Sequence, residues 1–195
     1  MESKQLFSIF VLIFIVLSSV ERLWWTFLKE KEQEKGEVKA KWTLNLLNIS
    51  HAIIIVGSIL EYLVSGRKII FFITILGLGM FIVAFWLRRL SARTLGKFQS
   101  LQIEIRESHL FINNGPYRYI RHPWYLSIIL EVLSITLILN AYYSLLYVFI
   151  VHIPIILVRV YFEEKALSEI FPDEYTKYKK EVWAFLPFKR ENKKD

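Results

Sequence analysis

Long apolar segments separated by short polar ones dominate the chain. A helix needs roughly 20 apolar residues to cross the hydrocarbon core of a bilayer. The pattern therefore predicts about five transmembrane helices, over residues 5–28, 43–64, 68–87, 124–140 and 143–161. Because only Ser65 to Lys68 separate the second and third segments, we expect a tight antiparallel hairpin there. The last two segments, joined at residues 140–142, predict a second hairpin.

Two longer polar regions remain, residues 88–123 and 162–195. The fold class predicted is an all-α integral membrane protein, a single membrane domain over 1–195. The connector 88–123 and the C-terminal tail form its cytoplasmic cofactor-binding, catalytic region. Within the tail, Pro172 predicts the start of an amphipathic helix. The mixed charges of residues 29–41 predict a solvated linker without chemistry.

The distribution of Lys and Arg predicts the orientation of the helices. The N-terminus and the turns at 65–68 and 140–142 hold three of these residues, whereas residues 21–42, 88–121 and 162–195 hold twenty-one. Positive loops stay in the cytoplasm. We therefore expect the N-terminus outside and the C-terminus inside.

Composition narrows the chemistry. The chain has 195 residues, 54% of them hydrophobic, a formal net charge of +7 and no Cys. The absence of Cys excludes disulfides, thiolate catalysis and Cys-ligated metals. No two His residues lie four positions apart, so no metal site is expected. The positive charge indicates loops beside anionic lipid and not a nucleic-acid surface.

The densest cluster of unusual residues is 113–125, NNGPYRYIRHPWY. Asn-Gly-Pro predicts a turn, and Pro123 suits the first turn of a helix. Arg121 and His122 would then lie at the helix N-terminus, where an anionic group is stabilised. The alternative interpretation is a basic membrane boundary with aromatic anchors.

Arg159, Glu163 and Glu164 form a second cluster at the inner end of the last apolar segment. A charge at that depth is costly and marks a candidate functional site. A simple salt bridge between Arg159 and Glu163, four positions apart, is the alternative. Since the last two helices form a hairpin, residues 121–125 and 159–163 are expected to be neighbours.

Other polar or small residues in the apolar segments favour structural roles. His51 and His152 are expected to bond to neighbouring helices, and Glu131 to hydrogen-bond between helices or be neutral. Gly77 and Gly79 predict close helix packing.

The C-terminal half, from about Gln102 to Phe188, resembles the isoprenylcysteine carboxyl methyltransferase family. The resemblance rests on GPYRYIRHPWY at 115–125, RxxxEE from Arg159 to Glu164, and FPDEYTKYKKEVWAFLPF at 171–188. It implies S-adenosylmethionine as methyl donor and Arg159 as the catalytic, substrate-binding arginine. The implied cofactor-binding residues are Gln102, His109, Leu110, Phe111, Ile112, Tyr117, His122, Pro123, Trp124, Tyr125 and Glu163.

The resemblance implies methyl transfer to the carboxylate of a lipophilic substrate, such as a C-terminal isoprenylcysteine. The tail helix, with Tyr175 and Tyr178, would cover the cofactor. The short form suggests a prokaryotic plasma membrane. The alternatives are a phospholipid N-methyltransferase with Glu163 or Glu164 as base, an NADPH-dependent membrane reductase, and a non-catalytic scaffold.

Overall fold

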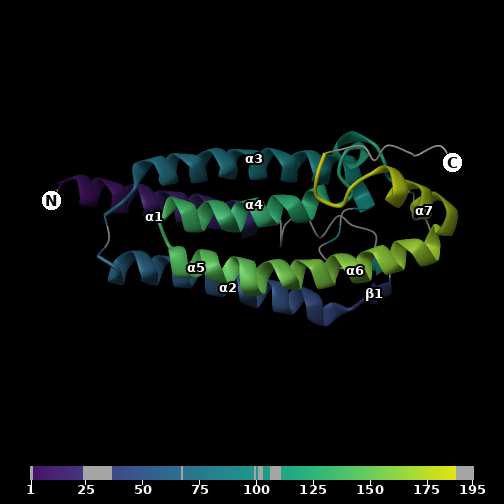
Figure 1. Ribbon diagram of the computed structural model, residues 1–195, viewed down its shortest axis with the longest axis horizontal. Helices are drawn as coiled ribbons and strands as arrows, with labels where there is room; N and C mark the ends of the chain where they lie inside the picture. Colours follow the sequence, from purple (N-terminus) through teal and green to yellow (C-terminus); the bar gives the residue numbers. More distant parts are fainter. Residues whose placement is uncertain are drawn as a thin grey trace.

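The computed structural model of the chain describes residues 2–23, 37–66, 68–98, 100, 103–105 and 111–187. Long helices lie side by side along one axis, with the N-terminus at one end and the small helix α7 at the other (Figure 1). The helices are α1 (Glu2–Leu23), α2 (Lys41–Val64), α3 (Phe71–Leu95), α4 (Pro123–Ile138), α5 (Tyr142–Tyr147), α6 (Ile153–Ile170) and α7 (Pro172–Glu181). Short elements complete it: η3 (Gly96–Phe98), η4 (Gly115–Arg118), the π-helical η5 (Val148–His152), β1 (Glu37–Lys39) and β2 (Ile103–Ile105). The fold is that of a helical membrane protein, as predicted.

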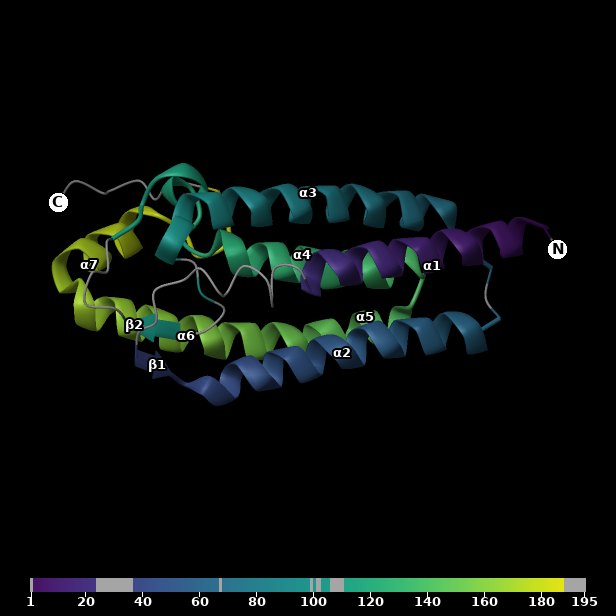
Figure 2. The ribbon, with the colours of Figure 1, turned by 180° about the vertical axis from the view of Figure 1, so that it is seen from behind.

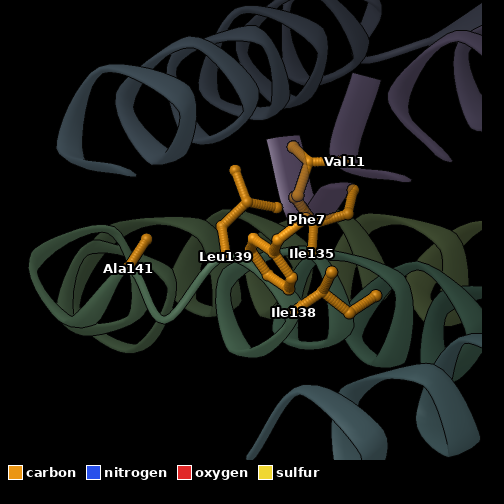
Figure 3. Close-up of a cluster of buried hydrophobic side chains, with 6 residues drawn as sticks. All are labelled: Phe7, Val11, Ile135, Ile138, Leu139 and Ala141. Atoms are coloured by element: carbon orange, nitrogen blue, oxygen red, sulfur yellow. The ribbon is translucent and has the colours of Figure 1, made fainter. Parts of the chain in front are cut away.

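The helices form two layers, with α3 and α4 in one and α2 with α5 and α6 in the other (Figures 1 and 2). The prediction of a tight hairpin from the second and third apolar segments is therefore wrong. α2 and α3 follow each other in the chain, but α3 packs mainly along α4. α1 lies against α4 from the side, where Phe7 and Val11 meet Ile135, Ile138 and Leu139 (Figure 3).

α3 comes closest to α4 at Gly77. A Cβ atom at this position would come within 2.9 Å of the Ile138 backbone nitrogen and 3.0 Å of the Ser134 carbonyl oxygen. The helix backbones can approach this closely only because Gly has no side chain. The packing role predicted for Gly77 is confirmed, whereas that for Gly79 is wrong, since a Cβ atom there meets nothing within 4 Å.

Hydrogen bonds at the turn between α4 and α5 stabilise the hairpin that these helices form. Asn140 adopts a left-handed conformation with φ of 54°. Its amide donates to the Thr74 hydroxyl at 3.0 Å, and its side-chain oxygen accepts from the Ile70 amide at 3.0 Å. Glu61 of α2 accepts hydrogen bonds from the amides of Tyr143 and Ser144 and thereby caps α5. The turn predicted at residues 140–142 is thus tied to both layers.

Among the described residues, three helices are long and apolar enough to cross a membrane by length and composition: α2, α3 and the continuous helix Tyr142–Ile170. Gln5–Val16 and Pro123–Ile138 are shorter apolar helices. The protein is therefore a multi-pass membrane protein, and the count of five spans stays a prediction. Large apolar side chains point outward along these helices, among them Ile53, Val56 and Ile75. That exposure suits lipid and not water.

Two helices extend beyond their apolar segments. α3 continues from the predicted end at 87 to Leu95, and α6 continues from 161 to Ile170. Their polar turns are stabilised by partners inside the protein: Arg88 pairs with Glu131, and Glu164 pairs with Arg121. Hydropathy alone ends these helices too early because it does not register such pairing.

The end of the predicted linker 29–41 is not a bare solvated loop. Residues 37–39 form β1, which pairs antiparallel with β2, and Glu37 lies opposite Ile105. The ammonium of Lys39 lies 2.8 Å from the carboxylate of Glu169 on α6. Residues 29–36 of that linker lie outside the described residues. At least one charged side chain of this segment, Lys39, therefore forms an ion pair with the helices.

Candidate active site

The sequence before α4 forms a sharp turn that brings aromatic and basic side chains to one end of the helices. Gly115 has φ of 55°, and a Cβ atom there would meet the Thr94 hydroxyl at 2.5 Å. The short helix η4 follows and buries Tyr117. α4 then starts at Pro123, as predicted, with buried His122 as its N-terminal flanking residue.

The helix hairpin brings the two sequence clusters together, as predicted. The Tyr125 hydroxyl on α4 donates a 2.6 Å hydrogen bond to the carboxylate of Glu163 on α6. The same hydroxyl accepts a 3.1 Å hydrogen bond from Nε of Arg159. Nη1 of Arg159 also donates to the Thr43 hydroxyl on α2 at 2.9 Å. The Tyr125 hydroxyl therefore bridges the guanidinium and the carboxylate.

His122 lies between two carboxylates. Its Nε2 is 3.0 Å from Oε1 of Glu164, and its Nδ1 is 3.7 Å from Oε1 of Glu163. Burial would lower the pKa of His122, but the hydrogen bonds and negative charges of Glu163 and Glu164 raise it above its ordinary value. The two carboxylates therefore favour the protonated form of the ring.

Tyr117 contributes a neutral phenol. Burial raises the pKa of Tyr117 well above its ordinary value, and the nearby charge of Glu163 raises it further. The ring therefore stays protonated over the physiological pH range and can serve as an aromatic wall.

The C-terminal tail crosses the start of α4. The amide of Arg121 donates to the Trp183 carbonyl at 2.9 Å, and the amide of His122 to the Ala184 carbonyl at 3.0 Å. The guanidinium of Arg121 donates to Glu164 and to the carbonyl of Val182. The anionic group beside Arg121 is therefore the carboxylate of Glu164, a group of the protein itself.

A pocket lies where α2, α3, α4 and α6 converge. Its empty space, open mouth included, is about 790 Å³. Six residues that the resemblance singled out line it: Tyr117, His122, Trp124, Tyr125, Arg159 and Glu163. No group of three metal-ligating side chains occurs in the part of the chain that the structure describes.

Other expected cofactor residues lie elsewhere. Phe111 packs in an aromatic cluster with Phe171, Tyr175 and Tyr178 of the tail, at centroid distances of 5.3–6.2 Å. Ile112 and the buried Pro123 are likewise outside the pocket lining. Gln102, His109 and Leu110 lie outside the described residues. α7 begins at Pro172 as predicted, but its two tyrosines pack on Phe111 and do not line the pocket.

Sequence reasoning missed two participants. Arg88, counted with the cytoplasmic connector, is buried on α3, lines the pocket and donates to Glu131 of α4 at 2.5 Å. Thr43, at the start of α2, contacts Arg159. For Arg88, the only signal in the sequence was an arginine directly after one apolar segment and a glutamate, Glu131, within the next. Nothing in the sequence marked Thr43. His152 bonds to Ser50 of α2 at 2.9 Å, which confirms its expected structural role.

Comparison with known proteins places these residues in a family. The model of the isoprenylcysteine carboxyl methyltransferase (ICMT) family matches residues 75–169. Over these residues the chain is similar to the ICMT family. The matched segment runs from α3 to the end of α6 and therefore includes both sequence clusters.

Relatives match beyond this segment, but each match is partial. The protein-S-isoprenylcysteine O-methyltransferase of Saccharomyces cerevisiae is 32% identical over 117 residues, 59% of this chain and 49% of the yeast protein. A probable enzyme of that name from Oryza sativa subsp. indica is 27% identical over 132 residues, 60% of this chain and 62% of that protein. The uncharacterized protein YpbQ of Bacillus subtilis is 32% identical over 92 residues, 47% of this chain and 52% of that protein. The chain thus spans about half to three fifths of the length of these curated relatives.

The fold is also shared with a solved ICMT structure. The structure of the eukaryotic intramembrane Ras methyltransferase ICMT superimposes with a TM-score of 0.57 at 23% identity. The match covers 77% of this chain and 54% of that one. The helical arrangement is therefore that of an ICMT-type membrane fold.

Proposed function

We propose that the protein is an S-adenosylmethionine-dependent methyltransferase that methylates the carboxylate of a lipophilic acceptor such as a C-terminal isoprenylcysteine. The observation that carries this proposal is Arg159. Its buried guanidinium lines the pocket, is oriented by Tyr125 and Thr43, and lies beside the carboxylate of Glu163. The ICMT family match supports the same reaction.

The pocket suits a cationic methyl donor. S-adenosylmethionine supplies, when bound, an electrophilic methyl group on a sulfonium centre. Carboxylates and aromatic faces stabilise cations, and Glu163, Tyr117, Trp124 and Tyr125 offer both at the pocket wall. Glu163 keeps 32% of its side chain exposed there, which leaves room for a hydroxyl or ammonium partner. By family resemblance we also propose Gln102, His109 and Leu110 as donor-binding residues.

Arg159 would bind the acceptor carboxylate, for which a fork of N–H donors is well suited. A terminal carboxyl group has a pKa of about 3.5, so it is already ionised at neutral pH and no general base is required. The reaction forms an O–CH3 bond on the acceptor and breaks the S–CH3 bond of the donor. The residues of the pocket therefore need only align the reactants and exclude water.

The lipid part of the acceptor would lie against apolar side chains. Leu44, Leu47 and Ile128 line the pocket beside Arg159. α2 also exposes apolar side chains that suit hydrocarbon, among them Leu46 and Ile49. We propose that the pocket end of the helices lies on the cytoplasmic side, with the N-terminus outside, and that the membrane is a prokaryotic plasma membrane.

The two other enzyme classes are not favoured by the family match. Phospholipid N-methylation would also require a base to remove a proton from the amine. Both carboxylates that could serve already accept hydrogen bonds, Glu163 from Tyr125 and Glu164 from Arg121.

Titration calorimetry with S-adenosylhomocysteine, with NADPH for comparison, tests the donor on the detergent-purified chain. A methyl-transfer assay with a farnesylated cysteine bearing a free carboxylate tests the acceptor. Arg159→Ala should abolish methyl transfer and leave S-adenosylhomocysteine affinity nearly unchanged. Lys165→Ala, at an exposed position of the same helix, is the matched control. Methyl transfer by Arg159→Ala near the wild-type rate would overturn the role of this residue, and NADPH binding alone would overturn the proposed function.

A further inference from the structure

Glu164 gathers cationic and polar donors from two distant segments of the chain. Its Oε1 accepts from Nε and Nη2 of Arg121, at 3.1 and 2.8 Å, and lies 3.0 Å from Nε2 of His122. Its Oε2 lies 2.7 Å from the ammonium of Lys179 on α7. Only 12% of the Glu164 side chain is exposed. One carboxylate therefore joins α6, the start of α4 and the tail helix.

Backbone carbonyls of the tail also bind the start of α4. The amides of Arg121 and His122 donate to the carbonyls of Trp183 and Ala184. The guanidinium of Arg121 adds a hydrogen bond to the carbonyl of Val182. Glu164 orients that guanidinium, so these backbone contacts depend on its charge.

His122 carries the effect of this fastening into the pocket. One ring nitrogen lies beside Glu164 and the other faces Glu163, which lines the pocket. The ring also contacts Phe185 of the tail, at a centroid distance of 6.1 Å. A movement of the tail or of Glu164 therefore changes the orientation of the imidazole and, with it, the contact to Glu163.

We propose that Glu164 is a positioning residue. It couples docking of residues 172–187, which are part of the C-terminal tail, to the arrangement of His122 and Glu163 in the pocket. The consequence of this coupling for methyl transfer rests on the proposed function. A docked tail holds His122 between the two carboxylates and leaves Glu163 oriented toward the donor site. An undocked tail releases His122 and weakens donor binding.

The first test compares Glu164→Gln with wild type by hydrogen exchange of the detergent-purified chain. Glu169→Gln is the matched control, because Glu169 lies on the same helix but pairs with Lys39 at the surface. A hydrogen bond to a charged group is worth about 1.5–3 kcal/mol, roughly ten- to a hundredfold in an equilibrium. We expect amide exchange at 121–122 and in 179–184 to accelerate about tenfold or more in Glu164→Gln, and to stay unchanged in the control. Unchanged exchange in Glu164→Gln overturns the fastening.

The second test measures the titration of His122 in the pocket without a ligand. Its result is therefore valid even if the proposed function is wrong. The chain has only four His, and the pH titration of His122 can be followed by NMR after ¹⁵N-histidine labelling. The ring faces Glu163 and Glu164 of α6, Tyr125 of α4 and Phe185 of the tail. Glu164→Gln should shift its titration midpoint to lower pH. If the tail opens while His122 titrates as in wild type, the coupling is overturned.

The third test measures S-adenosylhomocysteine affinity, which should fall about tenfold in Glu164→Gln, with KM for the donor rising accordingly. Unaltered affinity with an opened tail would show that Glu164 serves stability alone. Absence of binding and methyl transfer in wild type would instead refute the proposed function and leave the first two tests in force. If Glu164→Gln does not fold, Lys179→Met removes only the tail-side partner and should show the same changes at smaller size.

Discussion

Tyr125 and Glu163 are joined by a 2.6 Å hydrogen bond from phenol to carboxylate, across the hairpin formed by α4 and α6. The two residues are 38 positions apart in the sequence. Because the same hydroxyl accepts from Arg159, it fixes the separation of the guanidinium and the carboxylate at the pocket wall. In the proposed reaction, these two charged groups bind the two reactants, so their relative position determines alignment.

Tyr125→Phe should therefore lower kcat/KM for methyl transfer by about ten- to a hundredfold, since both charged partners lose a hydrogen bond. The ring remains, so folding should be preserved. Tyr119→Phe is the control, because Tyr119 is 51% exposed. Kinetics with a farnesylated cysteine measure the effect, and wild-type activity in Tyr125→Phe would show that the bridge does not align the reactants.

The sequence was sufficient to predict this meeting of residues 121–125 and 159–163. Two apolar helices joined by a short turn must run antiparallel, so their polar ends lie at the same level. The start of α4 at Pro123 and of α7 at Pro172 followed from the fixed φ of proline. These features are local and periodic, which is why hydropathy and turn residues disclose them.

Contacts without local periodicity were not predictable in this way. The tail binds the start of α4 through backbone carbonyls about 60 residues away, and no side-chain pattern marks such an acceptor. The packing of α3 on α4 includes a close backbone approach at Gly77. The sequence suggested the same role for Gly79, because glycine spacing alone cannot tell which face of a helix meets its neighbour.

The buried pair of Arg88 and Glu131 predicts a stability effect. Removing one partner of a buried ion pair leaves an uncompensated charge and costs about 3–5 kcal/mol. We expect Glu131→Met to lower the thermal midpoint strongly in detergent. The double variant Arg88→Met with Glu131→Met should recover much of the loss, because it removes both charges of the pair. Equal destabilisation by the single and double variants would contradict this account.

Gly77 and Gly79 form a matched pair for a packing test. Gly77→Ala places a methyl group against the backbone of α4 and should destabilise the protein by about 1–3 kcal/mol. Gly79→Ala meets open space and should be neutral or slightly stabilising, since Ala favours helix more than Gly does. Thermal unfolding of both variants in one detergent measures the difference. Similar losses in both would show that the approach of α3 to α4 does not depend on Gly77.

His122 predicts the direction in which stability depends on pH. Its folded-state pKa is raised, because the stabilising contacts with Glu163 and Glu164 outweigh the opposing effect of burial. A group of this kind stabilises the fold fully below its unfolded pKa of about 6.5 and loses that contribution as pH rises through the folded value. The thermal midpoint of wild type should therefore decline as pH rises above about 6.5. His122→Gln keeps a polar side chain but does not titrate, so the decline should be smaller in this variant. If the thermal midpoint of His122→Gln declines as much as that of wild type, other groups cause the effect. The support for a charged imidazole between the two carboxylates would then be removed.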